Sequence, residues 1–294
     1  NKTYTWDAPR VDVWLNNGTR QGARGIGTSA SFHGPVGLQL WSLREMLKTH
    51  VPLGLQMARG LGFTTVEVAG VPSSLPPAQL RQMLLAQGLN PVSGNWSYAD
   101  VSGKLDKVVT EAKALGVKYV GVGWIPRPNK RAFTEADAIA ASEIFNRAGA
   151  ALAKEGIRFF YHPHGYEFEP HGPGKTLFDL MAEKTDPKLV CFEMDVFWAF
   201  HAGQDPVKLM QKHTGRWELM HVKDMRSGTE TGIFTGAADK RNDVVVGTGM
   251  IDVAAALQEG QRQGIKYYFI EDESAEPVKQ IPQSLRWLES LSWK

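Results

Sequence analysis

Cysteine is almost absent from this sequence: Cys191 is the only one among 294 residues. A single thiol excludes an internal disulfide framework. No apolar run approaches the roughly 20 residues that a membrane span needs. The net charge is only +2, and lysine and arginine form no dense block, so neither nucleic acid nor a membrane is an expected partner.

The sequence also lacks a dinucleotide-binding motif and an initiator methionine. No Gly-x-Gly-x-x-Gly motif follows the first predicted strand, which disfavours a dinucleotide-binding fold. The first 35 residues lack periodicity, so we expect 1–35 to form an irregular arm outside the core. The chain begins at Asn1 without Met, which suits a processed secretory precursor or a trimmed chain. We therefore expect a periplasmic or secreted bacterial protein, with a cytoplasmic location as the alternative.

From residue 36 onward one rhythm is present, in which a short β-rich run is followed by a helical stretch. The runs are VGLQLW (36–41), FTTVEVAG (63–70), LNPVSGNW (89–96), VKYVGVGW (117–124), IRFFYHPH (157–164), LVCFEMDVFW (189–198), WELMHVKD (217–224) and IKYYFIEDE (265–273). Gly88, Gly116, Gly156 and Gly264 each precede a run, at the usual position of a helix C-cap. Alternating strands and helices imply parallel pairing, because a parallel crossover needs roughly a dozen residues. Eight units predict a single (β/α)8 TIM barrel over residues 36–294.

Polar side chains gather where the last four runs end. They are His162, His164 and Glu167; Glu193 and Asp195; His221, Lys223 and Asp224; and Glu271, Asp272 and Glu273. The active site of such a barrel lies at the carboxyl ends of its strands, so we expect these residues to meet. Mixed imidazole and carboxylate ligands suit Mn²⁺, Zn²⁺, Co²⁺ or Fe²⁺ better than Ca²⁺. The strand ends therefore predict one divalent metal ion; the alternative for each residue alone is a hydrogen-bonded histidine or a helix-capping carboxylate.

Aromatic residues stand at the same ends. Four tryptophans, Trp41, Trp96, Trp124 and Trp198, favour a platform for a sugar ring, with core packing as the alternative for each. Glu67, from the second run, is a further substrate-binding candidate. The stretch 225–249 is the longest without periodicity, and a loop of this length is usually functional. Neither a Gly-rich loop before a helix nor an arginine pair forms a phosphate cradle, so the substrate need not be phosphorylated.

Taken as a set, six motifs resemble the sugar phosphate isomerase/epimerase family, the xylose-isomerase-like TIM barrels. They are, in order, GLQLWSLRE, YHPHGYEF, EMDVFWAFHAG, HVKD, VGTGMID and KYYFIEDE, and the resemblance covers about residues 36–292. It implies one divalent metal (Mn, Zn, Co, Fe or Mg) held by a carboxylate or imidazole on strand five and by Asp195, His221 and Glu271. For strand five we take Glu167 as the ligand, with His164 as a rival ligand or as an acid/base.

The activity that this resemblance implies is isomerisation or epimerisation of a sugar or sugar derivative, by removal of a proton next to a metal-bound carbonyl. Glu271 and Glu167 would serve the two faces of the substrate, and His164 and His162 are candidate proton carriers. Lys223 would steady the enediolate oxygen, unless it forms a salt bridge with Asp224 or Glu193. The expected partner is a small carbohydrate, and a homo-oligomer is compatible with the sequence.

Three other functions stay open. The same enolate can lose a β-hydroxyl group, which would make the protein a lyase or dehydratase acting on a keto-sugar or cyclitol. AP endonucleases share the barrel, but they carry several metals and a basic groove, which the near-neutral charge disfavours. A sugar-binding protein without catalysis would need no metal. Sugar epimerases of the superfamily often have a histidine shortly after the strand-six aspartate, whereas this chain has Trp198.

Overall fold

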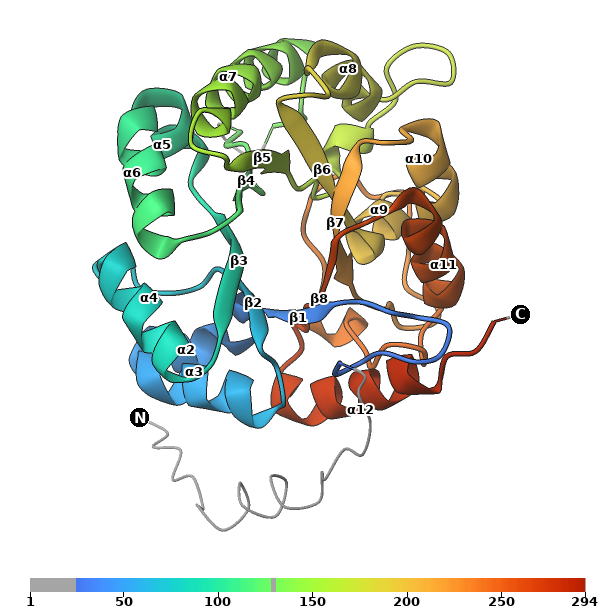
Figure 1. Ribbon diagram of the computed structural model, residues 1–294. Coiled ribbons are helices and arrows are strands. Elements are labelled where there is room, and N and C mark those ends of the chain that lie inside the picture. Colours follow the sequence, from blue (N-terminus) through green and yellow to red (C-terminus); the bar gives the residue numbers. More distant parts are fainter. Residues whose placement is uncertain (1–24, 128–130, 294) are drawn as a thin grey trace.

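The computed structural model of the protein describes residues 25–127 and 131–293. Within them, parallel strands form a closed barrel that is surrounded by helices (Figure 1). The strands are β1 (Val36–Gln39), β2 (Thr65–Val68), β3 (Asn90–Asn95), β4 (Tyr119–Val122), β5 (Arg158–Tyr161), β6 (Val190–Asp195), β7 (Trp217–Val222) and β8 (Tyr267–Ile270). Each strand pairs in parallel with the next, and β1 also pairs with β8, which closes the ring. The predicted (β/α)8 TIM barrel is confirmed.

Helices form the outer layer. They are α2 (Arg44–Thr49), α3 (Val51–Gly60), α4 (Pro77–Ala86), α5 (Tyr98–Gly103), α6 (Leu105–Leu115), α7 (Glu135–Ala153), α8 (Leu177–Lys184), α9 (Val196–His201), α10 (Pro206–Lys212), α11 (Val253–Gln263) and α12 (Pro277–Ser290), with short 3-10 turns η1 (Leu40–Leu43), η3 (Tyr166–Phe168) and η4 (Lys240–Asn242). Gly116 and Gly264 end α6 and α11 with φ of 77° and 82°, a backbone conformation that residues with a Cβ rarely adopt. The glycines therefore end helices where the sequence predicts. No helix within 25–127 and 131–293 combines the length and the apolar character that crossing a membrane requires.

The barrel interior has two layers of different chemistry. Every second residue of a strand points inward. The inward residues near the strand starts are apolar or aromatic and buried: Val92, Tyr119, Phe160, Cys191, Leu219 and Phe269. Two residues further along β6 and β7 the inward positions are Glu193 and His221, and His162 directly follows β5. A polar layer therefore rests on an apolar floor, and it faces the carboxyl ends of the strands.

The opposite, amino-terminal end of the barrel holds a hollow of about 750 Å³ that is lined by charged and phenolic side chains. Glu218 accepts hydrogen bonds from Arg158 (3.0 Å), Lys266 (2.7 Å) and Tyr119 (2.9 Å). These bonds tie the starts of β4, β5, β7 and β8 together. Residues at this end of a TIM barrel generally serve stability, and the pairing here fits that role.

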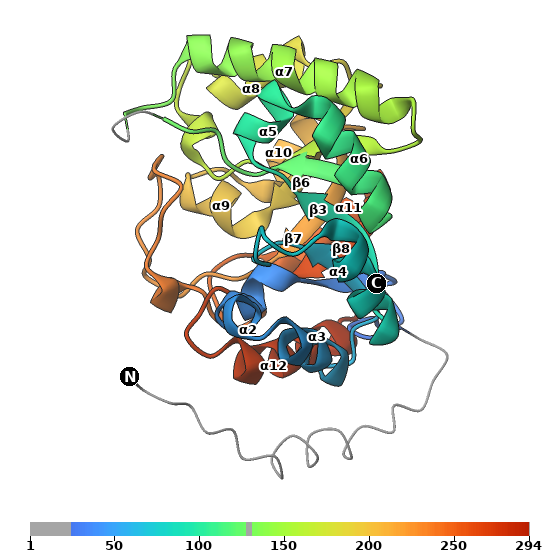
Figure 2. The same cartoon turned by 90° about the vertical axis from the view of Figure 1, so that its left-hand side faces the viewer.

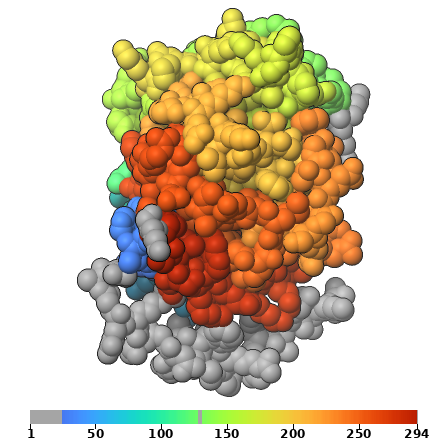
Figure 3. All heavy atoms as spheres, turned by 90° about the vertical axis from the view of Figure 1, so that its right-hand side faces the viewer, coloured from blue at the N-terminus to red at the C-terminus, as the bar shows by residue number. Residues whose placement is uncertain are grey.

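Residues 25–35 pack on the barrel. Phe32 is fully buried and meets the ring of Tyr268 edge-on, with ring centroids 4.9 Å apart. The Ser31 hydroxyl accepts the backbone N–H of Trp293 (3.0 Å), which follows α12. Figure 3 shows the blue N-terminal segment beside the red C-terminal helix. The predicted boundary at residue 36 is therefore wrong for 25–35, while residues 1–24 of the predicted arm lie outside the described residues.

The long segment 225–249 stands at the carboxyl end of the barrel, at the same end as α9 (Figure 2). Asp224 anchors it, because its carboxylate accepts the N–H groups of Gly247 (2.9 Å), Gly249 (2.8 Å) and Ile251 (3.2 Å). The segment is thus a fixed wall beside the strand ends, and Asp224 is not the partner of Lys223 that one interpretation of the sequence proposed.

Candidate functional site

Six ionisable side chains with little or no exposure converge at the carboxyl ends of the strands. They are Glu67 of β2, His162 after β5, Glu193 and Asp195 of β6, His221 of β7 and Glu271 after β8. Ionisable groups are rarely buried unless they are paired or hold a metal. The cluster formed by these six residues is therefore the candidate site, and it contains three of the predicted metal ligands, Asp195, His221 and Glu271.

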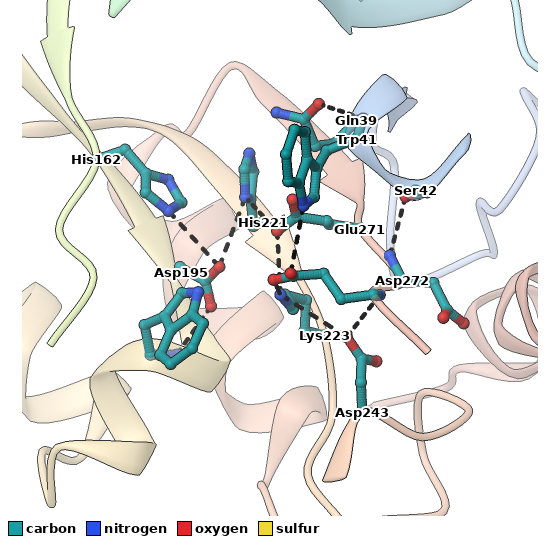
Figure 4. Close-up of polar contacts among 12 residues, drawn as sticks. Gln39, Trp41, Ser42, His162, Asp195, His221, Lys223, Asp243, Glu271 and Asp272 are labelled. Carbon is teal, nitrogen blue, oxygen red and sulfur yellow. Dashed lines mark hydrogen bonds and ion pairs between the residues drawn. The ribbon is translucent and has the colours of Figure 1, made fainter. Parts of the chain in front are cut away.

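One oxygen of Asp195 is the focus of this cluster. Asp195 Oδ2 lies 3.5 Å from His221 Nδ1 and 3.8 Å from His162 Nε2, and Glu271 Oε2 lies 3.2 Å from the same His221 nitrogen (Figure 4). Asp195 Oδ1 accepts the backbone N–H of Trp198 (2.9 Å) and so caps α9. Oδ2, in contrast, is buried and has no hydrogen-bond partner among the described residues. One oxygen of Asp195 is therefore structural and the other is left available to a ligand.

In both His162 and His221, the ring nitrogen that points away from Asp195 lies against a carboxylate. His162 Nδ1 lies 2.9 Å from Glu193 Oε2, and His221 Nε2 lies 3.2 Å from the same oxygen. His221 Nε2 is also 2.9 Å from Glu67 Oε1, and Glu67 in turn accepts hydrogen bonds from Gln39 (2.7 Å) and Asn95 (3.2 Å). A carboxylate behind an imidazole fixes its tautomer and leaves the other nitrogen free to bind. Glu193 thus orients two histidines, a role that the Glu-x-Asp spacing of 193 and 195 could have suggested.

The donor set fits a divalent metal ion. Ligand atoms of His162, Asp195 and His221 lie within 4.8 Å of one another, as do those of Glu67, Glu193 and His221. His221 belongs to both groups: its Nε2 lies against Glu67, and its Nδ1 lies against Asp195 Oδ2, which has no hydrogen-bond partner among the described residues. Burial alone would lower the pKa of His221, but the surrounding carboxylates outweigh it and raise the pKa well above the usual value. The cluster thus attracts a positive charge to this point, and nitrogen and carboxylate donors together are typical of transition metals.

Lys223 neutralises the side of the cluster formed by β8. Its ammonium group is buried and lies 3.1 Å from Glu271, 2.8 Å from Glu273 and 3.7 Å from Asp243. Burial by itself lowers the pKa of Lys223, but Glu271 and Glu273 raise it well above the ordinary value. Lys223 is therefore charged, and its partners are these carboxylates and not Asp224 or Glu193.

His164 lies beside the cluster, next to His162, but is not one of its six residues. Its ring centroid is 4.6 Å from that of His162, 5.6 Å from Trp124 and 5.5 Å from Trp198. Burial lowers its pKa, so the imidazole is neutral near pH 7. Its Nδ1 is buried and has no partner within the described ranges. An uncharged imidazole with a free nitrogen can accept a proton.

The structure does not bring Glu167 to the cluster. Its carboxylate accepts the hydroxyl of Tyr161 and the N–H groups of Gly165 (2.9 Å) and His164 (3.3 Å), and it belongs to neither ligand group. The cause is Gly165, whose φ of 104° turns the chain sharply into η3. Glu167 then faces back toward the end of β5. On the β5 side, the group that could hold a metal ion contains His162 and not Glu167.

Only two of the four predicted tryptophans are exposed. Trp41 is 40% exposed and Trp124 is 44% exposed. Trp198 is buried at 6%, and Trp96 is turned toward the helix layer, where its indole donates to Glu111 of α6 (3.0 Å). Glu67, the fifth substrate-binding candidate, is fully buried beneath His221. Trp96 and Glu67 are therefore corrected from substrate-facing to supporting residues.

Comparison with known proteins agrees with this architecture. Residues 55–291 match the family described as xylose isomerase-like TIM barrel, and the chain belongs to it. A relative named inosose dehydratase, from Geobacillus thermodenitrificans, is 26% identical over 158 residues, which are 51% of each chain. The chain thus spans about half the length of this curated relative.

Two solved structures share the fold. A sugar phosphate isomerase/epimerase from Parabacteroides distasonis superposes with a TM-score of 0.70 at 25% identity, covering 93% of this chain and 96% of that one. The IolI protein with a bound zinc atom superposes with a TM-score of 0.64 at 15% identity, covering 86% of this chain and 95% of that one. The second likeness extends to the fold alone.

Proposed function

We propose that the protein is a metal-dependent lyase that dehydrates a keto-sugar or keto-cyclitol by removing the proton next to its carbonyl group. The observation that carries this proposal is the buried group of His162, Asp195 and His221, in which Asp195 Oδ2 has no hydrogen-bond partner among the described residues. These three residues and Glu271 would hold the ion. When bound, such an ion would act as a Lewis acid that polarises the carbonyl and acidifies the adjacent C–H bond.

His164 is the residue we assign to the proton. It is neutral, it has a buried nitrogen without a partner, and it adjoins His162. In the elimination, the C–H bond breaks and its electron pair becomes the new C=C bond. The bond from the β-carbon to its hydroxyl breaks at the same time or later, and the hydroxyl leaves as water after taking up a proton. His164 can supply that proton, because it has just received one.

The choice of elimination over epimerisation rests on the position of Glu167. Epimerisation needs a second proton carrier on the opposite face of the substrate, and the sequence offered Glu167 for that task. Its carboxylate is instead occupied by Tyr161 and the backbone of its own loop. Elimination needs no carrier on the second face. The dehydratase name of the Geobacillus relative favours the same chemistry.

Isomerisation or epimerisation is the second candidate, favoured by the name of the Parabacteroides structure. It would require Glu271 to carry the proton on the face of the substrate opposite His164. Lys223 and His221 both contact Glu271 Oε2, which disfavours proton transfer at this oxygen. We assign Lys223 to holding Glu271 in place and not to contacting the substrate.

Incubation of the zinc- or manganese-loaded protein with an inosose in D₂O tests the proposal. We expect the product to be a dehydrated, conjugated ketone, which is followed by its ultraviolet absorbance and by mass spectrometry. Deuterium in recovered substrate without dehydration would favour the isomerase. Neither product nor exchange with a panel of inososes and keto-sugars would refute both candidates and favour a binding protein without catalysis.

A further inference from the structure

The hollow at the amino-terminal end of the barrel lies at the opposite end from the candidate site. Its lining includes the first residues of β4, β5 and β8, which are Tyr119, Arg158 and Tyr267, together with Lys118, Glu218 and Lys266. Its volume of about 750 Å³ falls within the roughly 300–1,000 Å³ that is typical of small-molecule sites. The barrel therefore has a second place, remote from the polar cluster, where a small molecule can fit.

Positive charge is in excess in this hollow. Three cationic side chains, Lys118, Arg158 and Lys266, line it, and Glu218 is the only carboxylate among the described lining residues. Burial raises the pKa of Glu218, but the hydrogen bond from Lys266 and the charge of Arg158 outweigh it and lower the pKa, so this carboxylate is ionised. The lining thus carries an excess of two positive charges.

Lys118 is the cation that the network around Glu218 leaves over. Arg158 and Lys266 both contact Glu218, whereas the exposed Lys118 forms no ion pair with a carboxylate in 25–127 and 131–293. Its ammonium group donates to the Tyr267 hydroxyl (3.0 Å) and lies 5.7 Å from the centroid of that ring. An ammonium group has three donors, so two remain, and the Tyr267 hydroxyl keeps its own hydrogen to donate. Support of the strand starts accounts for Glu218 and its partners, but it does not account for Lys118.

Apolar surface adjoins these donors. The half-buried ring of Tyr267 stacks on the buried Phe269 with an angle of 16° between the planes, and Tyr119 meets it edge-on with ring centroids 6.2 Å apart. Pro35 lines the same hollow. A ring that its neighbours already hold loses little freedom when a ligand packs against it. The hollow therefore presents an ordered aromatic face beside the free donors of Lys118.

We propose that this hollow binds a phosphate monoester, with the phosphate at Lys118 and Lys266 and its small organic group against Tyr267. A phosphate monoester carries a charge of about −1.5 to −2 near pH 7, which matches the excess of positive charge in the lining. Lysine and hydroxyl groups form charge-assisted hydrogen bonds to phosphate oxygens. The bound ligand joins the starts of β4 and β8, so it stabilises the folded chain by mass action.

Phenyl phosphate is the probe for this site, because its ring can pack on Tyr267 and it has no carbonyl group for the proposed dehydration. Binding to the chelator-treated full chain at pH 7.5 is measured by calorimetry, so that no metal ion can capture the phosphate. We expect saturable binding and a Tm that rises with ligand concentration. Lys118→Gln and Tyr267→Phe should each weaken binding about three- to tenfold, the effect of one charge-assisted hydrogen bond at a partly exposed position. Benzyl alcohol, which keeps the ring but not the charge, should bind at least about tenfold more weakly.

Lys113→Gln is the matched control, because it removes the same charge from a lysine that is paired with Glu155 (2.6 Å) and does not line the hollow. It should leave the affinity unchanged, and thermal unfolding without ligand checks that all three variants fold. Equal losses in Lys118→Gln and Lys113→Gln would indicate a diffuse electrostatic field in place of a site and overturn the proposal. Equal binding of benzyl alcohol, or no saturable binding of phenyl phosphate, would overturn it as well, and inorganic phosphate that binds as tightly as phenyl phosphate would refute the contact with Tyr267. Turnover of an inosose depends on the other end of the barrel, so the proposed function stands or falls separately.

Discussion

Replacing Glu167 by glutamine separates the two roles that this residue could have. The sequence predicts a metal ligand, and on that basis Glu167→Gln should release the metal. In the structure, its carboxylate instead accepts hydrogen bonds from Tyr161, His164 and Gly165. We therefore expect Glu167→Gln to keep the metal and to lose stability.

The expected loss can be worked out from the contacts and the pKa. Glutamine offers one acceptor oxygen and an NH₂ group, so at least one of the present donors loses its partner, at about 1.5–3 kcal/mol for a bond to a buried charged group. Burial raises the pKa of Glu167 from 4.5 to about 6. The folded protein therefore binds this proton more tightly than the unfolded chain. The resulting stability, about 2 kcal/mol, is fully present below pH 4.5 and is lost as the pH rises through 6.

Glutamine does not titrate, so the variant lacks this pH-dependent contribution. The gap in unfolding free energy between wild type and Glu167→Gln should be about 2 kcal/mol wider at pH 4.5 than at pH 7.5. Denaturant unfolding of the chelator-treated proteins measures it, and elemental analysis of the loaded proteins measures metal content. Glu169→Gln, in the same loop, is the matched control. Metal loss in Glu167→Gln with an unchanged free energy of unfolding at both pH values would refute this account.

Four further predictions concern the cluster and its surroundings. Asp195→Asn should lose the metal on gel filtration, and retention of a full equivalent would contradict the ligand assignment. Glu193→Ala should weaken zinc affinity roughly 10–100-fold in competition with a chromophoric chelator, because two imidazoles lose their orienting carboxylate; unchanged affinity would argue against that role. His164→Asn should keep the metal but slow dehydration by at least about 10²-fold; normal turnover would exclude His164 as the proton carrier. Phe32→Ala should lower the unfolding free energy by about 3–5 kcal/mol, whereas Leu85→Ala, at a 50% exposed position, should change it by no more than about 0.5; equal effects would place 25–35 outside the packed domain.

The sequence was sufficient for the barrel and for most of the cluster. Strand runs alternating with helical stretches determine a parallel barrel, because parallel neighbours need a crossover. Asp195, His221 and Glu271 come together for a related reason: the carboxyl ends of all strands form one rim, and alternation sends every second residue inward. Regular backbone geometry makes these positions readable from spacing alone.

Only the tertiary structure decided what happens where the backbone leaves that regularity. Glu167 lies five residues beyond His162, and the turn at Gly165 directs its carboxylate away from the cluster, a direction that spacing does not encode. Trp96 and Trp41 both stand near strand ends. The Trp96 indole donates a hydrogen bond to a residue of α6, whereas the Trp41 indole donates one to Glu273. Phe32 is buried because Tyr268, far away in sequence, offers it a surface. Side-chain direction in loops depends on partners distant along the chain, and those partners are adjacent only once the barrel has closed.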